Sequence, residues 1–156
     1  MNGTTTLPWE EISGFTGIHQ YLSNFWEACV TMEGKVYPTT EHAFQAAKTL
    51  DPDERRQIRM EVTPGRAKRL GRKVALRHDW DEIKEGVMLE LVRQKFTTHP
   101  ELARRLIHTG NARIVEENHW NDTLVRRLTG SISIDIDIKS STVLRHAVLR
   151  KLLFSS

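Results

Sequence analysis

The chain has 156 residues, 38% of them hydrophobic and 28% charged, so it is long enough for one domain with one core and too short for two. The single cysteine excludes an internal disulfide and a multi-cysteine zinc cluster. The 23 Lys and Arg residues against 20 Asp and Glu give a net charge of +3, which fits an anionic substrate or a transient nucleic-acid contact without requiring either.

We predict a single domain over residues 1–156, with a flexible polar start over 1–12. The first clear signal is a β-hairpin. Short apolar runs at 28–32 and 35–37 flank Glu33-Gly34, where glycine supplies the positive φ that a tight turn needs. No apolar run is long enough to cross a membrane, and the first residues lack the basic flank and apolar stretch of a secretion signal. We therefore expect a cytoplasmic protein without a membrane partner; oligomeric state cannot be inferred.

Helices follow the hairpin, each with its own start signal. Thr39 or Thr40 caps the first, Asp51-Pro52 starts the second, and Thr63-Pro64 starts the third, with Gly71 as its terminator. Asp79 with Glu82 resembles a capping box for a long helix. The predicted helices cover residues 41–50, 52–60, 64–71, 79–96 and 100–108.

The remaining elements mix strand and helix. Residues 113–117 are strand-like, 131–139 alternate strictly between isoleucine and polar residues as in a half-buried strand, and 142–154 form an amphipathic helix. Few strands, many helices and no alternation of strand with helix indicate the α+β class, a mostly helical domain around a small β-sheet.

The segment Thr40–Lys48 carries the most informative chemistry. In a helix, Glu41, Gln45 and Lys48 lie at i, i+4 and i+7, so that a carboxylate, an amide and an ammonium share one face. The alternative is an ordinary exposed face with one polar pair. Spacing alone does not choose between them.

Basic residues cluster in the third predicted helix. A solvated helix face is the common explanation of such a cluster, and a phosphate-binding surface is the alternative. The cluster comprises Arg66, Lys68, Arg69, Arg72 and Lys73.

Several motifs in order resemble the NADAR family, the YbiA-like N-glycosidases. The run Tyr21-Leu22-Ser23-Asn24-Phe25 is followed by Gly34-Lys35-Val36-Tyr37-Pro38-Thr39-Thr40 and then by Glu41-His42-Ala43-Phe44-Gln45-Ala46-Ala47-Lys48. The likeness continues through Gly71, Trp80 and Lys95-Phe96 to Asn121-Asp122. It covers roughly residues 21 to 122, and the Glu-His-x-Phe-Gln-x-x-Lys core is specific.

The resemblance implies the NADAR/YbiA-like fold and hydrolysis of N-glycosidic bonds to ribose. Implied substrates are phosphorylated ribosylamino intermediates of riboflavin synthesis, or ADP-ribose on guanine, which also leaves nucleic acid as a possible carrier. The family's functional positions match Glu41, Trp80 and Asp122, with Asn24 and Lys48 as accompanying polar groups. No cofactor is implied.

These residue types suit the reaction, because breaking an N-riboside develops positive charge at the anomeric carbon. We predict Glu41, Asp122 and Lys48 as catalytic residues: Glu41 as the carboxylate, Asp122 as a second acid, and Lys48 to stabilise the departing base or bind phosphate. Predicted substrate-binding residues are Asn24, Phe25, Gln45, Trp80 and Arg126. Trp80 offers a flat face for the base, against the alternative of simple packing, and Asn24 has the alternative of local backbone capping.

The segment after Asp122 departs from the family pattern, which continues into a glycine-rich stretch. Here Thr123-Leu124-Val125-Arg126-Arg127 follows, and Arg126 or Arg127 is expected to replace the lost backbone contacts. Two alternatives therefore stay open: an inactive family member that binds ADP-ribose or a nucleotide, and a basic nucleic-acid-binding module. Asp135 and Asp137 share a strand face, but we expect no bound metal.

Overall fold

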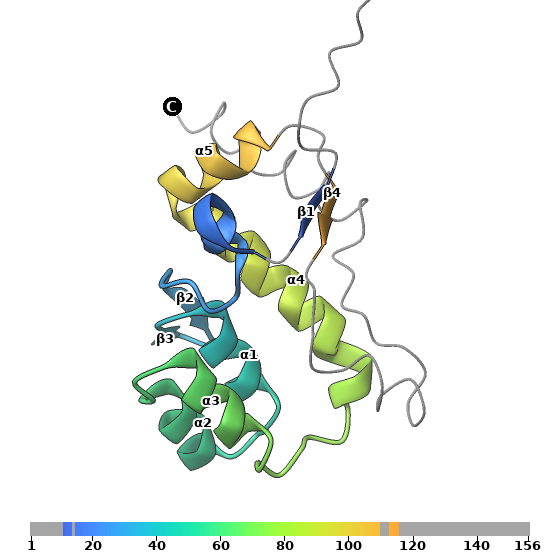
Figure 1. The fold of residues 1–156 in the computed structure, drawn as a ribbon. Helices are drawn as coiled ribbons and strands as arrows, with labels where there is room; N and C mark the ends of the chain where they lie inside the picture. Colours follow the sequence, from blue (N-terminus) through green and yellow to red (C-terminus); the bar gives the residue numbers. More distant parts are fainter. Residues whose placement is uncertain (1–10, 14, 110–112, 116–156) are drawn as a thin grey trace, which may run out of the picture.

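The computed structural model describes residues 11–13, 15–109 and 113–115. Helices dominate this part of the chain: α1 (Thr40–Ala47), α2 (Pro52–Arg59), α3 (Pro64–Gly71), α4 (Trp80–Thr98), α5 (Pro100–His108) and the 3-10 helix η1 (Gly17–Leu22). Helix α4 runs the length of the described fold, with α1, α2 and α3 gathered near one end and α5 at the other (Figure 1). The prediction of a mostly helical α+β domain is confirmed.

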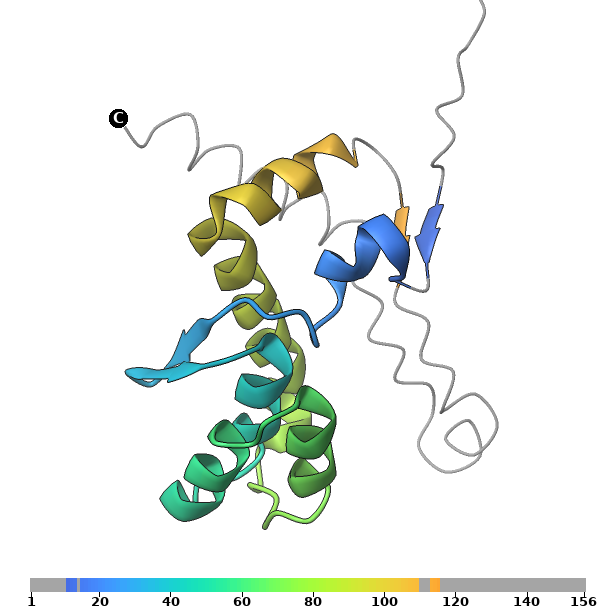
Figure 2. The same cartoon turned by 60° about the vertical axis from the view of Figure 1, so that its left-hand side comes forward.

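The strands form two separate pairs, where the sequence led us to expect one small sheet. Strands β2 (Val30–Met32) and β3 (Lys35–Tyr37) make the predicted antiparallel hairpin, which projects to one side of α4 (Figure 2). Strand β1 (Glu11–Ser13) pairs in parallel with β4 (Arg113–Val115). Strand β1 includes residues 11 and 12, which we expected to be flexible, and Ile12 is buried. The predicted elements 131–139 and 142–154 lie outside the described residues.

The hairpin turn needs two residues with positive φ. Glu33 has a φ of 48° and Gly34 a φ of 73°, which is the pattern of a two-residue type I′ turn. The sequence drew attention to glycine alone, but Glu33 takes the left-handed conformation as well. Its carboxylate pairs with Arg55 on α2 and so ties the turn to the helices.

Local capping signals set most of the helix starts. Asp51 accepts from the backbone N–H groups of Asp53 and Glu54, and Thr63 accepts from that of Arg66. The expected capping box at Asp79 is wrong. The Asp79 carboxylate makes no cap hydrogen bond and instead accepts from Arg77 Nε at 2.6 Å and from its second guanidinium nitrogen at 3.0 Å. A bidentate charged pair competes successfully for the carboxylate, and it lowers the pKa of Asp79.

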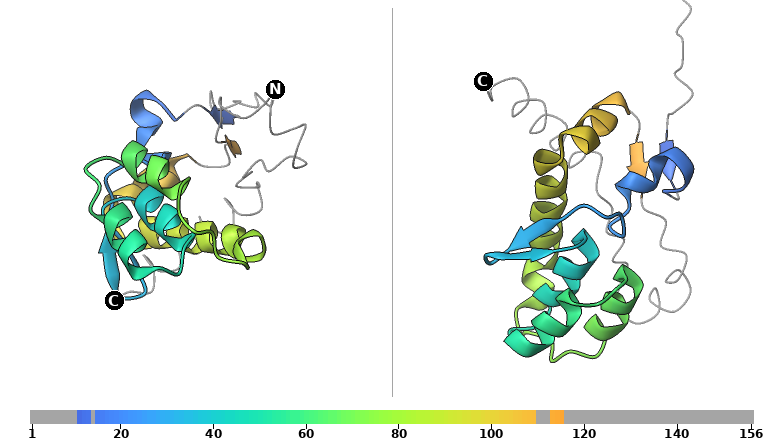
Figure 3. Two further views of the ribbon diagram at one scale, coloured as in Figure 1. Left: turned by 90° about the horizontal axis from the view of Figure 1, so that it is seen from below. Right: turned by 90° about the vertical axis from the view of Figure 1, so that its left-hand side faces the viewer.

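The core follows α4, which packs against α1, α5 and β2. Helix α1 packs against α2, α3 and α4, and α4 packs in turn against α5 and β2 (Figure 3). Buried hydrophobic side chains of the core come from η1, β2 and all five α-helices of the described part, for example Tyr21, Val30, Ala43, Ile58, Ala67, Leu91, Phe96 and Leu106. The helix that carries the Glu-His-x-Phe-Gln-x-x-Lys motif is thus central in the described fold.

Candidate functional site

Hydrogen bonds at the N-terminal end of α1 hold this helix in place. The Thr39 hydroxyl oxygen accepts the backbone N–H of His42 and lies 2.8 Å from Nδ1 of the same residue. Nε2 of His42 lies 3.0 Å from the carbonyl oxygen of Glu61, which can only accept, so Nε2 carries a proton and donates to it. His42 is therefore a structural link between α1 and the segment that joins α2 to α3.

Glu41 is the buried carboxylate of this helix. Its side chain is 5% exposed, and one carboxylate oxygen accepts a hydrogen bond from Gln45 Nε2 at 2.7 Å. The predicted common face of these two residues is confirmed, whereas the alternative of an exposed helix face is wrong, because Gln45 is itself buried. A buried carboxylate held by an amide has a fixed direction, as a catalytic charge requires.

The turn that precedes the hairpin places Asn24 beside Glu41. The backbone N–H of Glu41 donates to the carbonyl oxygen of Asn24 at 3.0 Å, and Asn24 is buried. Phe25 is 42% exposed, so its ring is available to a ligand. The ammonium group of Lys95 donates to the carbonyl oxygen of Ser23 at 2.8 Å and anchors the same turn to α4.

Lys48 caps the C-terminal end of α1. Burial lowers the pKa of its amine, the attraction of Glu41 raises it, and the repulsion of Lys68 and Arg72 lowers it further. The ammonium group lies 6.0 Å from the centre of the Phe44 ring. An amine with a lowered pKa gives up its proton more readily than an ordinary lysine, which suits a proton donor to a leaving group.

Helix α3 presses against the Glu41–Gln45 pair at Gly71. A Cβ atom at position 71 would lie 2.1 Å from Gln45 Oε1, so only glycine fits. The sequence marked Gly71 as a helix terminator, but it is the last residue of α3 and its role is this close approach. Lys68, one turn earlier on the same helix, lies with its ammonium 5.7 Å from the centre of the Phe25 ring.

Trp80 is packed rather than open. It is 7% exposed, and its ring lies 5.1 Å from that of Phe44, centre to centre, at an interplanar angle of 57°. This contact favours the packing interpretation, and base stacking stays a prediction. Asp122 and Arg126 lie outside the described residues, as do Asp135 and Asp137. Within the described ranges, no group of three His, Cys, Asp or Glu side chains is placed to hold a metal ion.

Sequence reasoning missed two residues that support this site. Lys95 is 1% exposed although it is charged, and Gly71 allows α3 to approach Gln45. A signal for Lys95 was present, because it follows Leu91 by four residues on the buried stripe of α4. No local signal separates the packing role of Gly71 from that of a helix stop.

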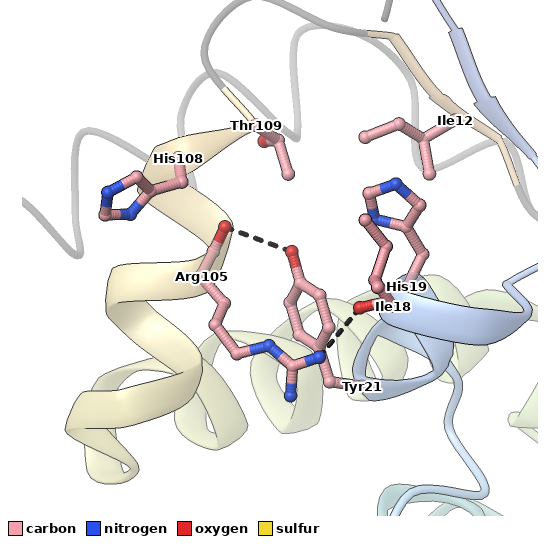
Figure 4. Close-up of a pocket in the computed structure, with 7 residues that line it drawn as sticks. All are labelled: Ile12, Ile18, His19, Tyr21, Arg105, His108 and Thr109. Atoms are coloured by element: carbon pink, nitrogen blue, oxygen red, sulfur yellow. Dashed lines mark hydrogen bonds between the residues drawn. The ribbon is translucent and has the colours of Figure 1, made fainter.

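A separate pocket of about 380 Å³ lies between η1 and α5 (Figure 4). Its wall holds η1 in place: Tyr21 Oη donates to the carbonyl oxygen of Arg105 at 3.1 Å, and Arg105 donates to that of Ile18 at 2.7 Å. The Arg105 guanidinium also lies 4.0 Å from the centre of the Tyr21 ring. Since η1 leads directly into the turn at Asn24, these contacts position the turn. Of the predicted site residues that the structure describes, none lines this pocket.

The motif and its surroundings match a known family. The model of the NADAR domain matches residues 14–124, which is more than half of the chain. The chain belongs to the NADAR family. The described residues of the candidate site all fall inside that match.

Individual proteins are also similar to this chain in sequence. The chain is 42% identical over 107 residues to the N-glycosidase YbiA of Escherichia coli strain K12, covering 65% of this chain and 67% of that protein. It is 34% identical over 110 residues to a riboflavin biosynthesis protein of Vibrio vulnificus, covering 67% of this chain and 30% of that protein.

The fold is similar as well. The NMR structure of E. coli YbiA superposes with a TM-score of 0.74 at 31% identity, covering 95% of this chain and 90% of that one. The predicted NADAR/YbiA-like fold is confirmed. None of the helices in the described part is long and apolar enough to span a membrane.

Proposed function

We propose that this protein hydrolyses the N-glycosidic bond of a phosphorylated ribosyl or ADP-ribosyl compound. The observation that carries the proposal is the buried Glu41 carboxylate. Gln45 orients it by a hydrogen bond, and Lys48, at the C-terminal end of α1, interacts with it electrostatically. The names of the relatives, N-glycosidase and riboflavin biosynthesis protein, support a hydrolase that acts on N-glycosyl bonds. A cytoplasmic location remains part of the proposal.

In the proposed reaction, Glu41 stabilises the positive charge that forms on the ribose. As the bond between the anomeric carbon and the base nitrogen lengthens, its electron pair moves to the nitrogen and the ribose becomes positively charged. Glu41, fixed by Gln45, stabilises this charge without having to reorient during the reaction.

Proton transfers complete the reaction. The oxygen of a water molecule forms the new bond to the anomeric carbon while Glu41 accepts a proton from that water. Lys48 donates a proton to the departing nitrogen, and its lowered pKa favours that transfer. We assign the ribose hydroxyl to Asn24, because its backbone carbonyl accepts the backbone N–H of Glu41 and the two residues are therefore neighbours. Asp122 and Arg126 are proposed as the second acid and as a substrate contact, on the resemblance alone.

The test removes the charge of Glu41 and keeps its shape. Wild type and Glu41→Gln are incubated with ADP-ribosylated guanine and with a ribosylaminopyrimidine phosphate, and the released base is followed by mass spectrometry. We expect the variant to lose about 10²- to 10⁴-fold in rate, because a fixed charge and a base act together at this position.

Glu85→Gln is the matched control, since Glu85 lies exposed on α4 and outside the site. Its rate should equal that of wild type. Equal product from wild type and Glu41→Gln would remove Glu41 from the mechanism. Binding of ADP-ribose without any bond cleavage by wild type would point to an inactive, ligand-binding member of the family.

A further inference from the structure

Helix α3 presents a cationic face next to the catalytic helix. Lys68, Gly71 and Arg72 lie at i, i+3 and i+4, so they share one side of the helix end. Gly71 contacts Gln45, which places this side against α1. The two cations therefore border the Glu41–Gln45 pair.

Within the described residues, no carboxylate forms an ion pair with the charges on this face. Neither Lys68 nor Arg72 forms an ion pair with any residue of the described part, whereas Arg66 on the same helix pairs with Glu61 at 2.7 Å. Lys48 also belongs to this group, because Lys68 and Arg72 repel its ammonium. In the described part, these three cations and the Glu41 carboxylate thus form one electrostatic group with an excess of two positive charges.

The exposed ring of Phe25 adds a wall to this face. Lys68 extends over the ring, with its ammonium 5.7 Å from the ring centre, and the partly buried stem keeps the charged end near the site. Arg72 is exposed and has a planar fork of N–H donors that matches two oxygens of a phosphate. The components of an anion site are therefore present: the Phe25 ring, the Lys68 ammonium above it, and a guanidinium that pairs with no carboxylate of the described part.

We propose that Lys68 and Arg72, together with the ring of Phe25, form the subsite that binds the phosphate of the substrate. The proposal rests on the function proposed above and adds the substrate class, because this face favours a ribosyl phosphate or diphosphate over an uncharged nucleoside. A phosphate held there places the sugar against α1, where Glu41 and Lys48 lie.

The test compares three variants. Lys68→Gln and Arg72→Gln each remove one charge from the face, and Lys73→Gln removes the same charge from the other side of the α3 end, beside Gln57 and Val74. For a ribosylaminopyrimidine 5′-phosphate we expect KM to rise about tenfold in each face variant, since a hydrogen bond to a charged group is lost. The rise in KM should exceed any fall in kcat, and Lys73→Gln should match wild type.

The phosphate itself is tested with the dephosphorylated ribosylaminopyrimidine. The two face variants and wild type should then have equal KM values, because the missing group is the one that the subsite holds. If KM for the phosphorylated substrate is the same in Lys68→Gln, Arg72→Gln and Lys73→Gln, the subsite is overturned while the glycosidase function stands.

Binding separates the two proposals if wild type cleaves nothing. Ribose 5-phosphate and ADP-ribose are titrated into wild type, the Lys68→Gln/Arg72→Gln double variant and Lys73→Gln by calorimetry. Loss of binding in the double variant alone supports the subsite and overturns only the catalytic proposal. If wild type binds one of the two probes more tightly, that preference tells whether the subsite favours a phosphate monoester or a diphosphate. Equal affinities of all three proteins for these ligands reject the subsite.

Discussion

At the scale of single residues, the site depends on a glycine that carries no chemistry. Gln45 orients Glu41, and Gly71 leaves the room in which the Gln45 amide lies. The i, i+4 spacing predicted that Glu41 and Gln45 share one face of a helix, because both belong to one helix, but it did not decide whether that face is buried. The contact with Gly71 was not predictable, since it joins two helices whose packing no local pattern encodes.

Gly71→Ala should therefore damage both stability and activity. The added Cβ must displace the Gln45 amide, so we expect the free energy of unfolding to fall by about 1–3 kcal/mol and the rate of base release to fall with it. Gly86→Ala is the control: it lies in α4, its added Cβ has no atom within 4 Å apart from the adjoining helix backbone, and it should raise stability by about 0.5–1 kcal/mol. Urea unfolding of both variants checks this, and a Gly71→Ala protein as active as wild type would contradict the role given to Gln45.

At the scale of elements, threonine caps define where the site helices begin. Thr39 starts α1 and Thr63 starts α3. The sequence limited the first cap to Thr39 or Thr40 and named Thr63 for the second, because a cap involves neighbours only three residues apart. The same kind of reading failed at Asp79, where Arg77, two residues earlier, takes the carboxylate. A capping signal in the sequence therefore predicts the cap only where no charged neighbour competes for the capping side chain.

Thr39→Ala should cost more stability than Thr63→Ala. Thr39 is buried and serves both the backbone N–H and the ring of His42, so its loss should lower the free energy of unfolding by about 2 kcal/mol. Thr63 caps at an exposed position with a single hydrogen bond, and its loss should cost about 1 kcal/mol. Thermal unfolding followed by circular dichroism compares the two; equal losses would mean that the His42 ring contact contributes nothing.

At the scale of the whole molecule, long-range contacts decide how the pieces of the site meet. The sequence predicted the class, the hairpin and the order of helices, but not the parallel pairing of β1 with β4. That pairing joins Glu11 to Arg113, and the residue pattern of either strand does not predict which other strand it pairs with. The Lys95–Ser23 hydrogen bond spans the chain in the same manner and holds the turn before Asn24.

Lys95→Met should release that turn from α4. Methionine preserves the buried stem but cannot donate to Ser23, so the positions of Asn24 and Phe25 relax and kcat/KM should fall about tenfold or more. Hydrogen exchange of the backbone over residues 23–26 should become faster. Arg93→Met, an exposed position on the same helix, is the control and should change neither quantity. Slow exchange together with full activity in Lys95→Met would exclude the positioning role.

Helix α1 is buried along its whole length, and this has a consequence for how such a protein can acquire a new substrate. A mutation on α1 disturbs the core at once, so few survive selection there. The exposed residues at Phe25 and on the solvent side of α3 tolerate exchange, and in the proposals above they contact the substrate without carrying the reaction. Divergence of specificity should therefore accumulate in those two segments while the residues of α1 stay unchanged, and directed evolution toward other ribosyl compounds would do best to randomise them first.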